Sequence, residues 1–179
     1  DDPVKFALDI KKILSDDGLW ICEQSHSHSL IESNCYDSIC HEHATYLSLS
    51  TFEKICKEVG LKILDIRTNN INGGSFALVM SHESSNYTQD FNNINNFKQK
   101  EHELKINSKE TWIEFKYQVQ KHKDDLINCI KKLKSENKKI FGYGASTKGN
   151  VILQYCGFSS KEIQFMLERD HLKYGLITP

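Results

Sequence analysis

The sequence lacks an apolar run long enough to cross a bilayer, which would take about 20 residues. It also lacks an excess of either charge, because 23 Lys and Arg face 24 Asp and Glu and the formal net charge is −1. Proteins that bind nucleic acid usually carry a basic excess or a basic stripe. We therefore expect neither a membrane nor a nucleic acid as partner.

Paired cysteines are absent as well. The chain has six cysteines, and they are scattered without a CxxC pair. In a chain of normal apolar content we interpret them as reduced, packed thiols and not as a disulfide framework. The first residues, DDPVKFALDIKK, lack the basic and apolar regions of a signal peptide. Both observations predict a cytoplasmic protein.

The two ends of the sequence are interpreted as cuts through a longer protein. A helical pattern begins at once, with Asp2 as its cap and Pro3 at the first helical position. The other end, GLITP, follows a strand-like run. After the first helix come the turn SDDG and the strand LWICEQ. This order predicts an open α/β sheet, in which ligands gather at the carboxyl ends of the strands.

The middle of the chain predicts one helix and a hairpin. Ser50 with Glu53 is typical of a capping box, and Gly60 is a natural end for the helix. LKILDIR and SFALVMS are expected to be strands, joined through the glycine turn in TNNINGG. The Asn-rich residues 83–100 are weakly patterned and are interpreted as a linker.

The last part predicts a long helix and a β-α-β unit. Residues 108–135 carry an apolar stripe at helical spacing, which we interpret as core. The strand KKIFGYG, the helix STKGNVILQYC and the strand IQFMLER follow. The turn GYGASTKGN between them fits neither a Walker A loop nor a dinucleotide fingerprint. It is either a tight β-α turn that needs small residues or a phosphate cradle at a helix N-terminus.

Histidines and cysteines gather around the stretch CHEHATYLS at residues 40–48. They are His26, His28, His41, His43, Cys22, Cys35 and Cys40. Their spacing fits no standard zinc pattern, although HSH and HEH could chelate a metal. A solvated polar loop is a second interpretation. In a third, a histidine acts as a base beside a carboxylate and removes a proton next to a carbonyl group, which leaves an enolate.

Several motifs in succession resemble the S-adenosylmethionine-dependent sugar C-methyltransferase family. They are YDSICHEHATYLSLSTFEKICKEVGLKILDI, NGGSF, IFGYGASTKGNVILQYCG and a strand ending in ERDHLKYGLITP. Enzymes of this family methylate a carbon of a nucleotide-linked keto-sugar, as in deoxysugar biosynthesis. The resemblance implies an α/β fold: the end of a class I methyltransferase Rossmann-like sheet (1–97), followed by a partial Rossmann-like substrate-binding domain (98–179).

The resemblance also implies which residues act. His43 matches the catalytic base, and Glu42 matches the neighbouring carboxylate that orients the sugar or the base. The substrate-binding positions implied in the same way are His41, Tyr46, Asn72, Gly73, Gly74, Ser75, Gly142, Tyr143, Gly144, Ser146, Lys148 and Asn150. The main S-adenosylmethionine loop and the zinc cysteines are expected upstream, so that this chain would hold no metal and would be inactive alone.

Cys40 departs from the pattern of the family, which often has a tyrosine directly before HEH. A thiol is a weaker hydrogen-bond donor than a phenol, so Cys40 cannot stabilise an enolate equally well. Tyr36 or Tyr46 could compensate for it. Two alternatives therefore stay open: a methyltransferase with another small-molecule acceptor, and a non-catalytic module that binds nucleotide-sugars.

Overall fold

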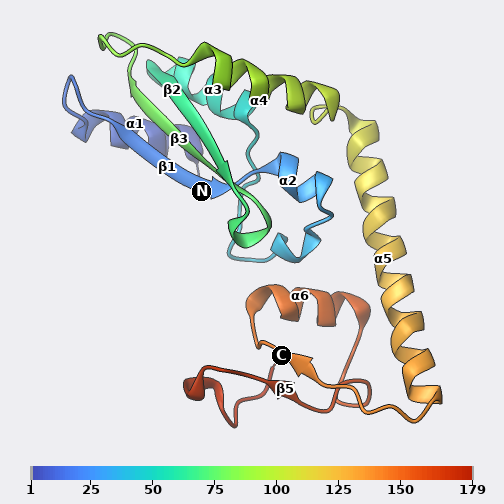
Figure 1. The fold of residues 1–179 in the computed structure, drawn as a ribbon. Coiled ribbons are helices and arrows are strands. Elements are labelled where there is room, and N and C mark those ends of the chain that lie inside the picture. Colours follow the sequence, from blue (N-terminus) through green and yellow to red (C-terminus); the bar gives the residue numbers. More distant parts are fainter. Residues whose placement is uncertain (1, 179) are drawn as a thin grey trace. The chain divides into compact units, whose positions relative to one another are not determined.

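The computed structural model describes residues 2–178, apart from the side chain of Asn72, and it divides into two compact units (Figure 1). Unit 1 comprises Asp1–Cys35 and Ala44–Trp112, and unit 2 comprises Tyr36–His43 and Ile113–Pro179. The segment Tyr36–His43, here called the 36–43 loop, therefore belongs with the later part of the chain. The domain boundary between residues 97 and 98 stays a prediction, since compactness does not test it.

Unit 1 is built on a three-stranded sheet with the order β1-β3-β2. The strands are β1 (Trp20–Ser25), β2 (Leu61–Asn69) and β3 (Ser75–His82), and β3 is antiparallel to both neighbours. The two outer strands consequently run in the same direction. The predicted hairpin is confirmed, with the short 3-10 helix η2 (Ile71–Gly73) in its turn. The α/β class is confirmed at this level.

Local sequence signals set the helices α1 (Pro3–Ile13), α2 (Ser27–Glu32) and α3 (Leu49–Val59). Asp2 caps α1 as predicted, and Gly60 ends α3 in a left-handed conformation, also as predicted. The predicted cap of α3 was wrong: Ser48, and not Ser50, accepts the hydrogen bond from the amide of Thr51. Glu53 forms no capping box with Ser50; its carboxylate lies 2.5 Å from the ammonium group of Lys98.

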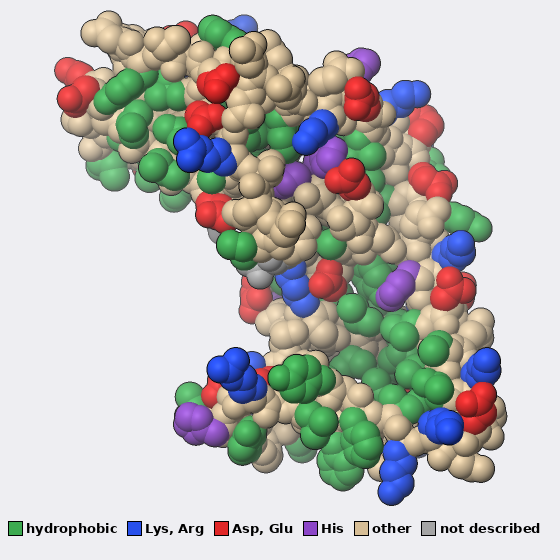
Figure 2. Space-filling view, viewed as in Figure 1, with side chains coloured by type: hydrophobic (Ala, Val, Ile, Leu, Met, Phe, Trp, Pro, Cys, Tyr) green, Lys and Arg blue, Asp and Glu red, His purple; other side chains and the backbone are tan. Residues whose placement is uncertain are grey.

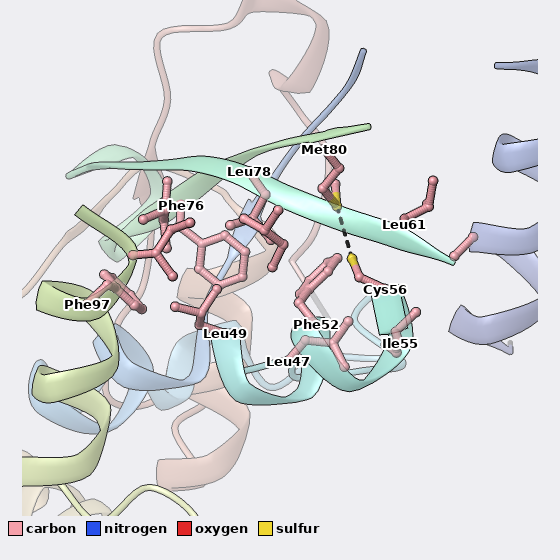
Figure 3. Packing of buried hydrophobic residues seen from close by; sticks show 14 of the residues in the cluster. Leu47, Leu49, Phe52, Ile55, Cys56, Leu61, Phe76, Leu78, Met80 and Phe97 are labelled. Carbon is pink, nitrogen blue, oxygen red and sulfur yellow. Dashed lines mark hydrogen bonds between the residues drawn. The ribbon is translucent and has the colours of Figure 1, made fainter. Parts of the chain in front are cut away.

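The core of unit 1 lies where the sheet meets α3 and the helix α4 (Phe91–Glu103) (Figure 3). The ring of Phe76 on β3 is fully buried between the rings of Phe52 and Phe97, with centroid distances of 5.6 and 6.2 Å. Edge-to-face pairs of this kind add to the stabilisation that burial itself gives. The core thus joins residues from three segments that are far apart in the sequence.

The prediction of a linker over residues 83–100 was wrong for its second half, which forms α4. Asp90 caps this helix through the amide of Asn93. Ile94, Phe97 and Glu101 follow at helical spacing and are all buried. Asn92, Asn95 and Asn96 are exposed, and Asn93 bonds to β2, so the apolar signal was too sparse to stand out.

Glu101 joins α4 to the start of α3. Its carboxylate is buried and accepts hydrogen bonds from the amides of Leu49 at 2.6 Å and Ser50 at 3.1 Å. The first amides of a helix have no partner within the helix, so Glu101 completes the cap that Ser48 begins. The negative charge also suits the positive end of the helix dipole.

We expect Glu101→Ala to lower the free energy of unfolding of unit 1 by about 2–3 kcal/mol, because one buried and one partly buried amide lose a charged acceptor. Urea unfolding followed by tryptophan fluorescence measures this directly, since both tryptophans, Trp20 and Trp112, lie in unit 1. Glu103→Ala is the matched control: this carboxylate accepts a hydrogen bond from Gln99 at the exposed surface. Equal effects of the two substitutions would contradict the role of Glu101 as a cap.

Unit 2 contains the predicted long helix and a small β-α-β unit. Its elements are η1 (Tyr36–Ser38), most of α5 (Lys109–Ser135), β4 (Gly142–Tyr143), α6 (Thr147–Cys156), β5 (Met166–Leu167) and η3 (His171–Lys173). The two strands are parallel, as predicted, but each is far shorter than the run of residues that predicted it. Figure 2 shows hydrophobic side chains on the surface of this unit. Phe141 and Phe165 are among the exposed hydrophobic residues of unit 2.

The apolar stripe of α5 is only partly core. Phe115 and Ile130 are buried, whereas Trp112 is 37% exposed. Among residues 2–178, none of the helices is both long enough and apolar enough to span a membrane.

Candidate functional site

The 36–43 loop holds His43 in a defined orientation. Nδ1 of its ring lies 2.8 Å from the carbonyl oxygen of Ser38. A carbonyl can only accept, so Nδ1 carries the proton and donates it. In the neutral ring the lone pair is therefore on Nε2. The side chain is half-buried, and its backbone amide donates to the carbonyl of Cys40 at 3.1 Å. This arrangement leaves Nε2 as the proton-accepting atom of the neutral His43 ring.

The other residues of the HEH motif face solvent. His41 and Glu42 are exposed, so their polar groups are accessible to a ligand. The thiol of Cys40 lies 3.9 Å from Oε2 of Glu42, within the range of a weak S–H···O hydrogen bond. Cys40 thus contacts the carboxylate beside the candidate base. Tyr36 cannot offer its hydroxyl in place of the missing tyrosine, because that hydroxyl is bonded to His122 and the residue is buried.

The two histidine pairs belong to different units. His26 and His28 lie in unit 1, and no three potential metal ligands form a cluster in the described part of the chain. Both ring nitrogens of His26 are occupied: Nδ1 accepts from the amide of Ser29 at 3.2 Å, and Nε2 donates to Oγ of Ser29 at 2.9 Å. Burial lowers the pKa of His26 to about 4, which keeps the ring neutral at pH 7. His26 is thus a structural histidine.

In the glycine-rich turn of unit 2, the local structure explains why Gly142 and Gly144 are glycines. A side chain at Gly142 would collide with the sulfur of Met166 on the neighbouring strand. Gly144 has a φ of 90°, which residues with a side chain rarely adopt. Ser146 caps α6 by accepting from the amide of Gly149 at 3.1 Å, while Tyr143 is exposed. The tight-turn interpretation is therefore sufficient for the glycines, and the phosphate cradle stays a prediction.

Glu168, which the sequence did not single out, fixes the glycine-rich turn. It follows β5 directly, and its Oε2 accepts from the amide of Ala145 at 2.7 Å. Oε1 accepts from the amides of Arg169 and Asp170, at 2.7 and 3.1 Å. Lys173 bridges the same two segments, since Nζ donates to the carbonyl of Ala145 at 2.9 Å and lies 3.5 Å from Oε2 of Glu168.

These amide hydrogen bonds lower the pKa of Glu168 to about 2, from an ordinary value of about 4.5. Because the folded state holds the carboxylate ionised, the group stabilises unit 2 fully above about pH 4.5. We expect this contribution to be lost as the pH falls toward 2. A carboxyl NMR titration should give a midpoint near 2, with the amide of Ala145 shifting in parallel. A midpoint near 4.5 would contradict the hydrogen-bonding pattern.

The NGGS turn and Tyr46 belong to unit 1. Gly74 has a φ of 115°, and a side chain there would collide with Ser29. Ser75 is buried and donates its hydroxyl to the carbonyl of Ile71 at 3.2 Å. Gly73 is exposed, Tyr46 is 36% exposed, and the side chain of Asn72 lies outside the described part of the structure. The observed contacts shape the turn, and the substrate-lining role of these residues stays a prediction.

The structure thus places the predicted site residues in two groups. His41, Glu42 and His43 share unit 2 with the glycine-rich turn, of which Lys148 and Asn150 lie in the first turns of α6. Within unit 2, the 36–43 loop packs at the C-terminal end of α6, through Tyr36 and Tyr155. The glycine-rich turn lies at the other end of this 10-residue helix, about 15 Å along its axis.

Two comparisons with known proteins bear on the function. The profile of a family described as the C-methyltransferase C-terminal domain matches residues 70–179, which is more than half of the chain. C-methyltransferase NovU of Streptomyces niveus is 27% identical over 170 residues. That alignment covers 95% of this chain but 40% of NovU, so the chain spans well under half the length of this curated relative.

Proposed function

The chain belongs to the family of C-methyltransferase C-terminal domains, and we propose that it is part of an enzyme that methylates a carbon next to the ketone of a nucleotide-linked sugar. The similarity to C-methyltransferase NovU along most of the chain supports the C-methyltransferase activity. The motifs HEH, NGGS and GYGASTKGN support the sugar substrate. The observation that carries the proposal is the hydrogen bond from His43 to Ser38, which leaves a basic nitrogen in the HEH motif.

His43 is the proposed general base. Nε2 would take the proton from the sugar carbon next to the ketone, and the electrons of the broken C–H bond would form the enolate. The proton on Nδ1 stays bonded to the carbonyl of Ser38, so that the imidazolium formed in this step keeps a neutral acceptor. A fixed tautomer matters here because only a lone pair on Nε2 can accept the proton.

Glu42 and His41 are proposed to bind the sugar. Both are exposed and adjoin His43 in the sequence, and the carboxylate of Glu42 can accept hydrogen bonds from sugar hydroxyl groups. The weak contact of Cys40 with Glu42 suggests that Cys40 helps to orient this carboxylate. An enolate would then need other donors than the residue directly before HEH.

The methyl donor of such an enzyme is S-adenosylmethionine, which supplies an electrophilic methyl group when bound. We propose that this chain does not hold the complete site for it, as the resemblance to the family implies. The glycine-rich turn is one segment with a suitable shape, but the amide of Ala145 is already bonded to Glu168. We therefore assign no residue of this chain to the methyl donor, and we propose that its main binding loop belongs to another part of the longer enzyme.

The β4-α6-β5 unit is proposed to be the start of a Rossmann-like domain that binds the nucleotide-sugar. Its parallel strands and the position of the glycine-rich turn at the N-terminal end of α6 support this, because the positive end of a helix dipole suits a phosphate group. In unit 1, β1 and β2 run in the same direction and are connected through α3, which supports the end of a Rossmann-like sheet.

Calorimetry with the full-length protein tests the proposal. A nucleotide-linked keto-sugar and S-adenosylmethionine should each bind, and the two together should give a methylated product. Binding of the nucleotide-sugar without any turnover would favour a non-catalytic module. Turnover of a ketone that lacks the nucleotide, with no binding of nucleotide-sugars, would favour another acceptor.

A further inference from the structure

We propose that Tyr36 is a positioning residue for His43, so that unit 2 carries the candidate base although the base lies early in the sequence. This inference rests on the proposed function. It starts from the observation that the 36–43 loop clusters with Ile113–Pro179 and not with the residues on either side of it in the sequence. Side-chain contacts must therefore hold the 36–43 loop on unit 2, and Tyr36 makes such contacts.

Tyr36 is held on two sides by helices of unit 2. It is 5% exposed, and the ring meets those of His122 on α5 and Tyr155 on α6, each at a centroid distance of 5.5 Å. Its hydroxyl lies 2.9 Å from Nδ1 of His122. Burial, together with the neighbouring Cys156 and Tyr155, raises the pKa of Tyr36 to about 12. The phenol therefore keeps its proton and lies within hydrogen-bond distance of the histidine ring nitrogen.

The two helices that hold Tyr36 also contact each other. The hydroxyl of Tyr155 donates to the side chain of Gln120 on α5 at 3.3 Å. The ammonium group of Lys123, also on α5, lies 4.6 Å from the centre of the Tyr155 ring. These contacts join α5 to α6 where Tyr36 packs, so Tyr36 lies between two helices that are bonded to each other.

Tyr36 and His43 are connected through the backbone of η1 and the hydrogen bonds that its carbonyl groups accept. The amide of Ile39 donates to the carbonyl of Tyr36 at 2.9 Å, which closes the short helix η1. Ser38, the last residue of η1, is 3% exposed, and its carbonyl accepts from the amide of Cys40 and from Nδ1 of His43. A movement of Tyr36 would therefore displace the acceptor that selects the tautomer of His43.

Steady-state kinetics of the full-length enzyme tests this inference, with a nucleotide-linked keto-sugar and S-adenosylmethionine as substrates. We expect Tyr36→Phe to lower kcat about fivefold through loss of one hydrogen bond. We expect Tyr36→Ala to lower it about 100-fold through misplacement of the base. KM for S-adenosylmethionine should stay unchanged in both variants. Tyr87→Phe is the matched control, because this hydroxyl donates to the carbonyl of Asp17 in unit 1 at the same distance of 2.9 Å.

A spectroscopic measurement separates positioning from general stability. Nitrogen NMR of the His43 ring should show the tautomer with the proton on Nδ1 in the wild type, and a mixture of tautomers in Tyr36→Phe. Substitution of His122 by Leu should have the same effect, and the double variant should be no worse than either single one. An unchanged tautomer and an unchanged kcat in Tyr36→Phe would overturn the inference. If His43→Ala also left turnover intact, the proposed function itself would fail.

Discussion

Replacement of His43 by alanine in the full-length enzyme is expected to lower the rate of methyl transfer by about 10²–10⁴-fold, the usual contribution of a positioned general base. The fold should persist, because the side chain is only half-buried and the carbonyl of Ser38 still accepts from the amide of Cys40 at 3.1 Å. Single-turnover assays with a saturating nucleotide-linked keto-sugar measure the loss. Affinity for that sugar should change much less than the rate.

His102→Ala is the control for this experiment. His102 lies on α4 of unit 1, is exposed, and is not part of the HEH motif. It should leave the rate unchanged. A rate for His43→Ala within a factor of two or three of the wild type would contradict the assignment of the base. A similar loss in both variants would indicate a general effect of removing a histidine.

The substitution Gly74→Ala is expected to destabilise unit 1 by about 3–5 kcal/mol, a large part of the stability of an ordinary domain. Two terms add up. The backbone of Gly74, with a φ of 115°, is strained for any residue that has a side chain. The added methyl group would also meet Oγ and Cβ of Ser29, which is itself bonded to the buried ring of His26. Urea unfolding followed by tryptophan fluorescence gives the value.

Gly60→Ala is the matched control in the same unit. Gly60 has a φ of 72°, and the atom nearest to an added methyl group is Nζ of Lys11, which can move. Its cost should be about 1 kcal/mol, the backbone term alone. The double substitution Ser29→Gly with Gly74→Ala should recover the steric part. Equal costs at the two glycines would show that Ser29 does not confine this turn.

Two signals that act within a few residues were interpreted correctly from the sequence. Asp2 before Pro3 and Gly60 after the apolar stripe set the ends of two helices, because caps act on their own helix. The start of α3 was not decided locally. Ser48 and Ser50 are both good caps by type, and the carboxylate of Glu101, from a distant helix, occupies the amides of Leu49 and Ser50. The choice between the two serines depended on a tertiary contact.

The candidate site shows the same limit. The motif HEH predicts His43 as the base, but nothing in the sequence indicated Ser38, because the group that orients the ring is a backbone carbonyl, which every residue has. Tyr36 and His122 are 86 residues apart, and only the fold brings them together. Glu168 is part of the motif ERDHLKYGLITP, but the sequence pattern predicted no role for it. The position of an acidic residue directly after the second strand of a β-α-β unit could have indicated that Glu168 has a role.

The most direct test of the central claim is transfer of a carbon-13 methyl group from labelled S-adenosylmethionine to a nucleotide-linked keto-sugar by the full-length enzyme, followed by NMR. We predict that the label appears as a methyl group on the carbon next to the ketone, and that it does so with wild-type enzyme and not with His43→Ala. A label on oxygen or nitrogen, or equal labelling by the two proteins, would contradict the account.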